Sequence, residues 1–422
     1  MLSHQDNELL TRVGAGTPMG ELMRRYWIPA GFSDQIAAPD GPPLRVRLLG
    51  EDLVLFRATD GRVGLLDERC PHRTASLFYG RNEQNGLRCV YHGIKFDVEG
   101  QCIEVPCVPF TDEAQLSNIK AKLAVKSYPC IERGGVIWAY MGPAEFKPEF
   151  PDLEWTLLPE SHHFVSRHIQ DCNWLQALEG GFDAPHLSFL HRGEVETSRR
   201  VVPSFYEVMA TDFGFVVGTG RDLGTSDIHW NVNVMLMPFH KIISSVPMAA
   251  HVWVPIDDQH TMLYSVDFNA NRPLNEDELA YARSGTWIHS ENAPGSDRAI
   301  YNQDNDYGVD RALQASGRSF TGIKGIGTQD CAIQESMGPI ADRGAERLLP
   351  GDAAIVKLRR LLLDALDNHA AGKPLPGMDP ASYRVRSTRC AVPKGEAFAA
   401  TMEARVRSKT ADTTSDALAL AR

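Results

Sequence analysis

Alternating and short apolar segments dominate the first third of the chain. Segments of this kind, each predicting a strand, lie at 44–48, 53–56, 63–66 and 135–140. At 44–48 leucine and valine alternate with arginine, a period of two that is typical of a half-buried strand. Asp60-Gly61 between two of these segments is a strong hairpin signal. We therefore expect a small antiparallel β domain at 41–145, followed by a proline-rich linker.

Helical patterns precede and follow this region. Residues 8–27 predict two short helices broken at 14–16, with Thr17 as N-cap and Pro18 as the first helical residue of the second. Beyond residue 150, helix-like segments lie at 172–190 and 352–367, and strand-like segments at 213–218, 230–237 and 261–267. The expected fold class is α+β, with an antiparallel sheet flanked by helices in the C-terminal part.

The composition excludes several classes of protein. With 422 residues, 43% hydrophobic and 23% charged, the chain has the make-up of a globular protein with more than one domain. A net charge of −11 without basic runs argues against nucleic-acid and anionic-membrane partners. No segment approaches the about 20 apolar residues of a membrane span, and MLSHQDNELL has no secretory-signal features. We expect a cytoplasmic protein whose eight cysteines are reduced.

Two short clusters each combine one cysteine with one histidine. Cys70 and His72 form the first cluster, and Cys89 and His92 form the second. Thiolate and imidazole groups can surround one tetrahedral zinc ion. They can equally hold a Rieske [2Fe–2S] cluster, in which two cysteines bind one iron and two histidines bind the other. Four unrelated core residues would be a third reading, but that reading does not explain why the spacing repeats.

The residues beside the second cluster favour the iron–sulfur alternative. Gly93 follows His92 directly, and the pattern Cys-x-His … Cys-x-x-His-Gly resembles that of the Rieske family at all four ligand positions. The resemblance implies a cluster that passes one electron at a time and presents its imidazole N–H groups at the surface. The remaining cysteines, interpreted as small buried residues, are Cys102, Cys107, Cys130, Cys172, Cys331 and Cys390.

A second group of candidate ligands lies in the first helix expected after residue 150. In a regular helix Glu179, Asp183 and His186 share one face, whereas His191 lies about 140° away from His186. Both imidazoles can reach one metal only if the helix is distorted, and Pro185 and the preceding glycine pair supply a weak point. Two histidines and one carboxylate on one face of an iron describe a non-haem Fe(II) oxygenase site.

The spacing Glu-x3-Asp-x2-His-x4-His resembles the mononuclear-iron motif of Rieske-type ring-hydroxylating oxygenases. This resemblance implies that His186 and His191 bind iron and that Asp183 is the bridge between two metal centres. It also implies a carboxylate ligand far down the chain, for which Asp330 is the best match and Glu335 the alternative. Three further histidines without a carboxylate partner are interpreted as structural or exposed, namely His162, His163 and His168.

Further segments extend the resemblance over nearly the whole chain, to the large subunit of the phthalate 4,5-dioxygenase branch. These segments are 12–27, 128–142 and 329–343. The resemblance implies a helical lead-in at 1–40 that packs on the catalytic domain, a Rieske domain at 41–145 and a mononuclear-iron catalytic domain at 146–422.

The resemblance also implies a function. The chain would be the terminal oxygenase of a multicomponent system that inserts oxygen from O2 into an aromatic substrate, an aromatic carboxylate by preference, by ring dihydroxylation. Electrons would come from NAD(P)H through a separate flavin and [2Fe–2S] reductase. The subunits would form a homotrimer or a stacked double trimer, in which His92 of one chain meets Asp183 of the next, and Asp183 in turn holds His186.

The sequence leaves open the identity of the substrate and the type of reaction. The candidate cations for a substrate carboxylate are Arg221, Lys241 and Arg318. Two segments near the expected pocket, 213–219 and Ala184-Pro185, carry no charge. Their lack of charge argues for a substrate that is a bulkier or singly charged aromatic. A monooxygenase that removes an O- or N-alkyl group or splits an aryl ether is the alternative within the class. A Rieske electron-transfer protein without oxygenase activity and a zinc-stabilised binding module are the alternatives outside it.

Overall fold

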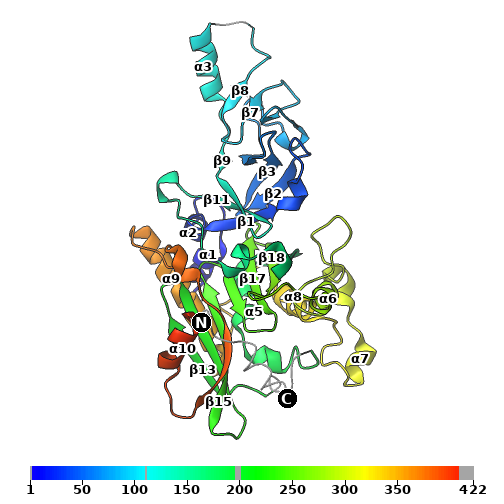
Figure 1. The fold of residues 1–422 in the computed structure, drawn as a ribbon, viewed down its shortest axis with the longest axis vertical. Helices are drawn as coiled ribbons and strands as arrows, with labels where there is room; N and C mark the ends of the chain where they lie inside the picture. Colours follow the sequence, from blue (N-terminus) through cyan, green and yellow to red (C-terminus); the bar gives the residue numbers. More distant parts are fainter. Residues whose placement is uncertain (1, 110–111, 195–200, 408–422) are drawn as a thin grey trace. The chain divides into compact units, whose positions relative to one another are not determined.

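The computed structural model describes residues 2–109, 112–194 and 201–407. Within it the chain forms two compact units (Figure 1). The small unit consists mainly of Met23–Pro148 together with Gly14–Gly16. The large unit consists of Glu149–Arg422 together with Met1–Val13 and Thr17–Leu22. The first helices, α1 (His4–Thr11) and α2 (Pro18–Met23), confirm the predicted break at 14–16, and Thr17 Oγ1 caps α2 by accepting the Gly20 N–H at 3.2 Å.

The small unit is built from antiparallel sheets, as expected. One four-stranded sheet contains β2 (Leu44–Leu48), β3 (Glu51–Arg57), β4 (Val63–Asp67) and β9 (Ser127–Tyr128). A second contains β5 (Arg81–Glu83), β6 (Gly86–Arg88), β7 (Lys95–Phe96) and β8 (Cys102–Glu104). A three-stranded sheet runs in the order β1 (Trp27–Phe32), β11 (Val136–Tyr140) and β10 (Cys130–Arg133).

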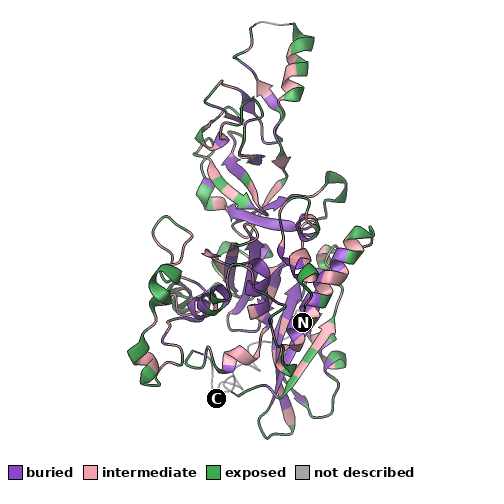
Figure 2. Cartoon of the chain, turned by 180° about the vertical axis from the view of Figure 1, so that it is seen from behind, coloured by how far each residue is buried: buried purple, intermediate pink, exposed green. Residues whose placement is uncertain are grey.

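The core of the small unit lies under the two four-stranded sheets. Phe56 from β3 and Phe96 from β7 are fully buried in one cluster that also contains Cys70 and Cys89. The Asp60-Gly61 turn joins β3 to β4 as predicted, with Gly61 at φ +88°. Helix α3 (Glu113–Lys122) has no buried residue and is green or pink in Figure 2. The loops that carry the cysteine and histidine clusters therefore start from a rigid apolar base.

The large unit is organised around an eight-stranded antiparallel sheet. Its strands, in spatial order, are β12 (His163–Gln170), β18 (Thr261–Phe268), β17 (Met248–Pro255), β16 (His240–Ile243), β15 (Asp227–Leu236), β14 (Gly214–Asp222) and β13 (Phe205–Ala210). Strand β19 (Thr388–Pro393) pairs with the first part of β15, beside the short β16. Strands β14 and β17 are buried along almost their whole length, and Figure 2 shows them in purple at the centre of this unit.

Helices cover the large sheet, and one of them carries a predicted metal ligand, Asp330. Helix α5 (Trp174–Phe182) packs on β17 and on helices α8 (Ile326–Ser336) and α9 (Ala353–Ala370), and α9 also packs on β13. The remaining helices of this unit are α4 (Glu154–Leu157), α6 (Glu276–Arg283), α7 (Arg311–Ala315) and α10 (Phe398–Arg407). None of the described helices combines the length and the apolar character needed to cross a bilayer.

The predicted helix at 172–190 is wrong in its second half. Regular helix ends at Phe182, Asp183 is its C-cap with an extended backbone, and a short 3₁₀ turn follows at Pro185–Ser188. The 3₁₀ turn begins at Pro185, which has no N–H to continue the α-helical ladder. His186 therefore lies in this 3₁₀ turn and His191 on the irregular chain after it, both beyond the helix.

Candidate metal centres

The two cysteine and histidine clusters of the small unit lie on loops with the same hydrogen-bond pattern. The Cys70 N–H donates to the Ala75 carbonyl and the Cys89 N–H to the Ile94 carbonyl, each five residues ahead. Four residues after each cysteine, the N–H of Thr74 or Gly93 returns to the cysteine carbonyl at 2.8 or 2.9 Å. Both returning residues have positive φ, +58° and +76°. Two equivalent tight loops thus hold one thiol and one imidazole each.

Gly93 is needed for a second reason besides its positive φ. A Cβ at this position would lie 2.8 Å from Cγ of Pro106, which is too close for an ordinary contact. The second loop can therefore close only with glycine after His92, as the Cys-x-x-His-Gly pattern requires.

Burial separates the two kinds of side chain. Cys70 and Cys89 are 1% and 2% exposed, and burial, with the Cys89 thiol beside it, raises the pKa of Cys70 to about 11. His72 is exposed and His92 is half-buried, and their Nδ1 atoms approach to 3.1 Å. Two buried thiols and two convergent ring nitrogens fit the donor set of a [2Fe–2S] cluster with two cysteine and two histidine ligands. The rings, rather than the thiols, face solvent.

In the large unit the structure brings three other predicted ligands together. His186 Nε2 and His191 Nε2 lie 3.1 Å apart, and Asp330 Oδ1 lies 3.6 Å from the first and 3.2 Å from the second. Metal–ligand bonds of about 2.1 Å place neighbouring ligands about 3 Å apart. Among the described residues, these three side chains form a group of possible metal ligands whose ligand atoms all lie within 4.8 Å of one another. Glu335, the alternative carboxylate, instead accepts hydrogen bonds from Gln303 and Tyr307.

Gln329, a residue that the sequence reasoning missed, orients His191. Its Nε2 donates to the Ile323 carbonyl at 2.8 Å, which leaves Oε1 to face His191 Nδ1 at 2.7 Å. Nδ1 must therefore carry the proton, and Nε2 presents its lone pair to the other two ligand atoms. The only signal in the sequence was its position directly before Asp330.

Asp183 lies beside this centre but not in it. Its Oδ2 is 3.8 Å from His186 Nδ1, on the opposite side of that ring from Nε2. Burial, with the charges of Asp352 and Asp330, raises the pKa of Asp183 to about 6. The side chain is nevertheless 37% exposed. Asp183 can thus accept from His186 and still be reached from outside the chain.

Glu179 faces away from the ligands, contrary to the helical-face prediction. It forms ion pairs with Arg343 at 2.9 Å and Arg359 at 2.6 Å, both of which are buried. Burial acts to raise the pKa of Glu179, but the two guanidinium groups outweigh it and hold that pKa below its usual value. Glu179 therefore anchors α5 in the large unit.

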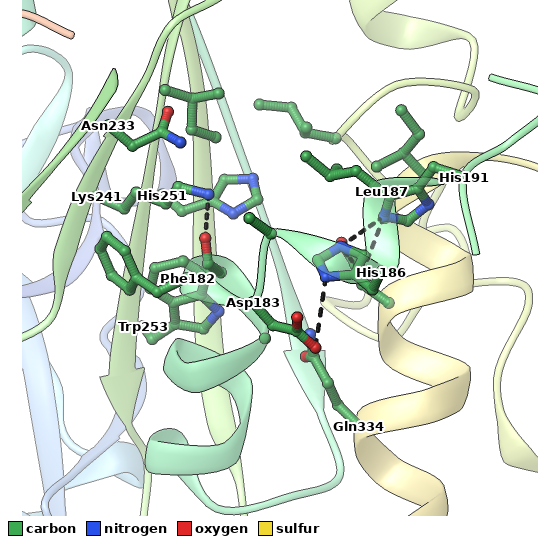
Figure 3. A pocket seen from close by; sticks show the side chains of 18 of the residues that line it. Phe182, Asp183, His186, Leu187, His191, Asn233, Lys241, His251, Trp253 and Gln334 are labelled. Carbon is green, nitrogen blue, oxygen red and sulfur yellow. Dashed lines mark hydrogen bonds and ion pairs between the residues drawn. The ribbon is translucent and has the colours of Figure 1, made fainter. Parts of the chain in front are cut away.

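The three ligand atoms lie in the wall of a cavity that opens to solvent. Figure 3 shows His186, Leu187 and His191 on one side and Asn233, Lys241 and His251 on the other. Of the three candidate cations only Lys241 lines this cavity. Arg221 is buried with its Nε on the Val201 carbonyl, and Arg318 is exposed with its Nε on Ser316.

The sequence reasoning also missed much of the cavity wall. The wall also contains Asn231, Asn233, His251 and Trp253. They lie in the middle of strands, and strand pairing brings together residues that are distant in the sequence. The available signal for His251 was a single polar residue within the apolar segment 248–255.

The other cysteines and histidines have ordinary structural environments, with one correction. Cys102, Cys172, Cys331 and Cys390 are buried and Cys130 is partly buried, but Cys107 is exposed, so its predicted burial is wrong. Cys107 follows β8 on a loop before α3, where no strand covers it. His168 is buried with Nε2 at 3.4 Å from Cys331 Sγ, and His162 Nδ1 lies 2.9 Å from the Asn269 carbonyl.

Comparison with known proteins agrees with this geometry. The Rieske [2Fe-2S] domain model matches residues 26–129, and the model described as LigXa C-terminal domain like matches 139–212 and 207–418. The chain is 40% identical to the 3-chlorobenzoate-3,4-dioxygenase oxygenase subunit of Comamonas testosteroni, over 95% of this chain and 98% of that protein. It is also 40% identical to the phthalate 4,5-dioxygenase oxygenase subunit of Pseudomonas putida, over 89% of each.

A solved structure shows the same fold. The crystal structure of dicamba monooxygenase bound to 3,6-dichlorosalicylic acid matches 83% of this chain and 99% of that chain, with a TM-score of 0.60 at 20% identity. The fold and the two candidate metal centres thus define an oxygenase with two separate iron sites. The chain belongs to the Rieske non-haem iron oxygenases, as an oxygenase subunit with a Rieske [2Fe–2S] cluster and a mononuclear iron site. The predicted α+β class and the resemblance to the phthalate 4,5-dioxygenase branch are confirmed.

Proposed function

We propose that this subunit inserts oxygen from O2 into an aromatic carboxylate by ring dihydroxylation. Electrons from NAD(P)H would reach it through a separate reductase that contains flavin and a [2Fe–2S] cluster. Three relatives are named for aryl carboxylates, namely 3-chlorobenzoate, phthalate and phenoxybenzoate. The single lysine in the cavity wall supplies a cation that such substrates need.

The proposal assigns each ligand residue. Cys70 and Cys89 would hold one iron of the cluster, and His72 and His92 would hold the other. In the large unit the mononuclear iron ligands would be His186, His191 and Asp330. Bound iron at these two sites would supply single electrons and the coordination positions at which O2 is activated.

The observation that carries the proposal is the close approach of three ligand atoms in the wall of a mostly apolar cavity. They lie 3.1–3.6 Å apart. Phe182, Leu187 and Trp253 line the same cavity and can hold an aromatic ring next to them.

Asp183 is proposed as the link between subunits. Its carboxylate has one oxygen near His186 and part of its surface exposed, so it can accept a second imidazole N–H from His92 of a neighbouring chain. This requires a ring of subunits, which we propose to be a trimer or a stacked double trimer.

The chain is proposed to have three parts, namely the lead-in at 1–40, the Rieske domain at 41–145 and the catalytic domain at 146–422.

Monooxygenation is the second candidate. The chain is 33% identical to the 5,5'-dehydrodivanillate O-demethylase oxygenase subunit of a Sphingobium species, over 88% of this chain. The same three-ligand geometry supports both outcomes, since ring dihydroxylation and dealkylation both need open positions opposite the ligands.

Product analysis with labelled O2 tests the proposal. The iron-loaded enzyme is supplied with a reductase, NADH and either 3-chlorobenzoate or phthalate. Two labelled atoms in a cis-diol support dihydroxylation, whereas one labelled atom in a phenol supports monooxygenation. Iron analysis should give about three irons per chain. Two irons per chain and no label in any product would instead indicate a Rieske electron carrier.

A further inference from the structure

Glu335 on α8 is a buried carboxylate that belongs to neither candidate metal centre. It is 6% exposed. The Tyr307 hydroxyl donates to its Oε2 at 2.6 Å, and the Gln303 amide donates to the same atom at 3.1 Å. Among the described residues, no lysine or arginine forms an ion pair with it, and burial raises the pKa of Glu335 above its usual value. A buried carboxylate held by neutral donors is costly, so its presence needs a reason.

The stronger of these hydrogen bonds comes from a strained piece of backbone. Asp306, Tyr307 and Gly308 are three successive residues in the left-handed region, at φ +49°, +53° and +63°. Residues other than glycine enter this region rarely and singly, and a bulky side chain there is a clear outlier. Such strain persists only where surrounding contacts impose it, and it is concentrated at functional sites. The backbone at 306–308 is therefore held in this form by what Tyr307 binds.

Helix α8 connects the hydrogen bond to the mononuclear centre. Asp330 lies five residues before Glu335 on this helix, which corresponds to about 7.5 Å along its axis. The side chain and the carbonyl of Gln334 accept hydrogen bonds from β12 and α5, each at 2.9 Å. Neighbouring residues project about 100° apart around a helix. The contacts at Gln334 and at Glu335 therefore hold α8 from two directions.

The rotation of α8 determines where the carboxylate of Asp330 lies. Its Oδ1 is 3.6 Å from Nε2 of His186 and 3.2 Å from Nε2 of His191. A side-chain atom lies about 6 Å from the helix axis, so a rotation of about 10° moves it by about 1 Å. A metal site needs its ligands within about 0.5 Å of the productive geometry. A contact that fixes this rotation therefore decides how well the three ligand atoms converge.

We propose that Tyr307 and Glu335 are positioning residues for the mononuclear iron, because their hydrogen bond fixes the rotation of α8 and thereby the place of Asp330. The inference deepens the proposed function and rests on its assignment of Asp330 as a ligand. Burial and the neighbouring carboxylate raise the pKa of Tyr307, so its hydroxyl stays a donor. The strained backbone at 306–308 is the means by which this donor reaches α8.

Iron affinity and the spectrum of the bound iron test this role together. The full-length oxygenase, with its cluster in place and oxidised, is stripped of mononuclear iron and titrated with Fe(II). Tyr307→Phe should weaken Fe(II) binding about tenfold, as loss of an outer hydrogen bond at a metal site typically does. Nitric oxide added to the loaded variant should give an altered EPR spectrum, because the carboxylate ligand is displaced. An unchanged Kd together with an unchanged spectrum would overturn the proposal, even if the Tm falls.

Matched variants separate positioning from a general loss of structure. Tyr301→Phe removes a hydroxyl from a side chain that is 40% exposed, and it should change neither readout. Glu335→Gln keeps an oxygen that accepts from Tyr307 and should retain most of the iron affinity, whereas Glu335→Leu should resemble Tyr307→Phe. Circular dichroism checks that each variant is folded. A folded Glu335→Leu variant with normal iron affinity would contradict the proposal.

Asp330→Ala separates this inference from the proposed function. Loss of the mononuclear iron in Asp330→Ala, with normal binding in Tyr307→Phe, would leave the ligand assignment standing and remove the positioning role. Normal iron binding in Asp330→Ala would instead remove the ligand assignment, and the positioning role with it.

Discussion

At the residue scale, the amide of Gln329 decides which nitrogen of His191 is available to a metal. Gln329→Leu removes the acceptor at 2.7 Å from His191 Nδ1, so the ring loses its fixed tautomer and orientation. Loss of such a partner typically lowers metal affinity about 10- to 100-fold. Titration of the metal-free protein with Fe(II) measures the change. Gln329→Glu keeps an acceptor for Nδ1 but loses the donor to the Ile323 carbonyl, so its iron affinity should fall less than that of the leucine variant. An unchanged Kd in the leucine variant would contradict the role.

Asp183 makes a separate prediction at this scale. Asp183→Asn keeps the size of the side chain but loses the charge that would hold two imidazoles. We expect full iron content at both centres and almost no product formation, because electrons would no longer pass between subunits. Iron analysis and the rate of product formation check this together. A metal-replete variant with normal turnover would show that Asp183 is not the link.

At the scale of the element, the glycine pair in α5 has a packing role that its sequence did not reveal. The sequence suggested that Gly180 and Gly181 loosen the helix. In the structure a Cβ on Gly180 would lie 2.2 Å from Gln334 Nε2, and one on Gly181 would lie 2.5 Å from the Trp253 ring. The glycines allow α5 to approach α8 and β17 closely, and the helix ends only afterwards.

Substitution by alanine separates the two contacts. Gly181→Ala should destabilise the protein by about 1–3 kcal/mol, because the Trp253 ring is buried and cannot move aside. Gly180→Ala should cost less, since the end of the Gln334 side chain can shift and alanine favours helix. Thermal unfolding measures both. A Tm for Gly181→Ala equal to or above that of Gly180→Ala would contradict this packing.

At the scale of the whole molecule, local motifs were predictable and distant pairings were not. The four cysteine and histidine positions, the hairpin at Asp60-Gly61 and the two histidines of the second motif could be identified because each is encoded within a few residues. Lys241 and His251 meet only because β16 pairs with β17, and Gln329 meets His191 across 138 residues. Such contacts depend on tertiary packing that no local pattern specifies.

Mixed oligomers test the subunit link at this scale. Cys70→Ser should remove the cluster, and Asp330→Ala should remove the mononuclear iron, so each homomeric variant should be inactive. Co-expressed and co-purified, the two variants should regain measurable product formation, because an intact cluster of one subunit serves an intact iron site of its neighbour. Co-expression of each variant with unmodified chain is the control. A mixed oligomer as inactive as its parents would exclude transfer between subunits.

The end of α5 at Phe182 has a consequence for the chain that follows it. Residues 183–194 have only one 3₁₀ turn, yet they contribute two of three ligand atoms, while α8 contributes the third from a regular helix. A bound ion would therefore connect this segment to a rigid helix and stabilise its conformation. Stripping the ion should accelerate amide hydrogen exchange at 184–194 more than within α8. Mass spectrometry of metal-free and loaded protein measures this, and equal protection in both would show that the segment holds its shape unaided.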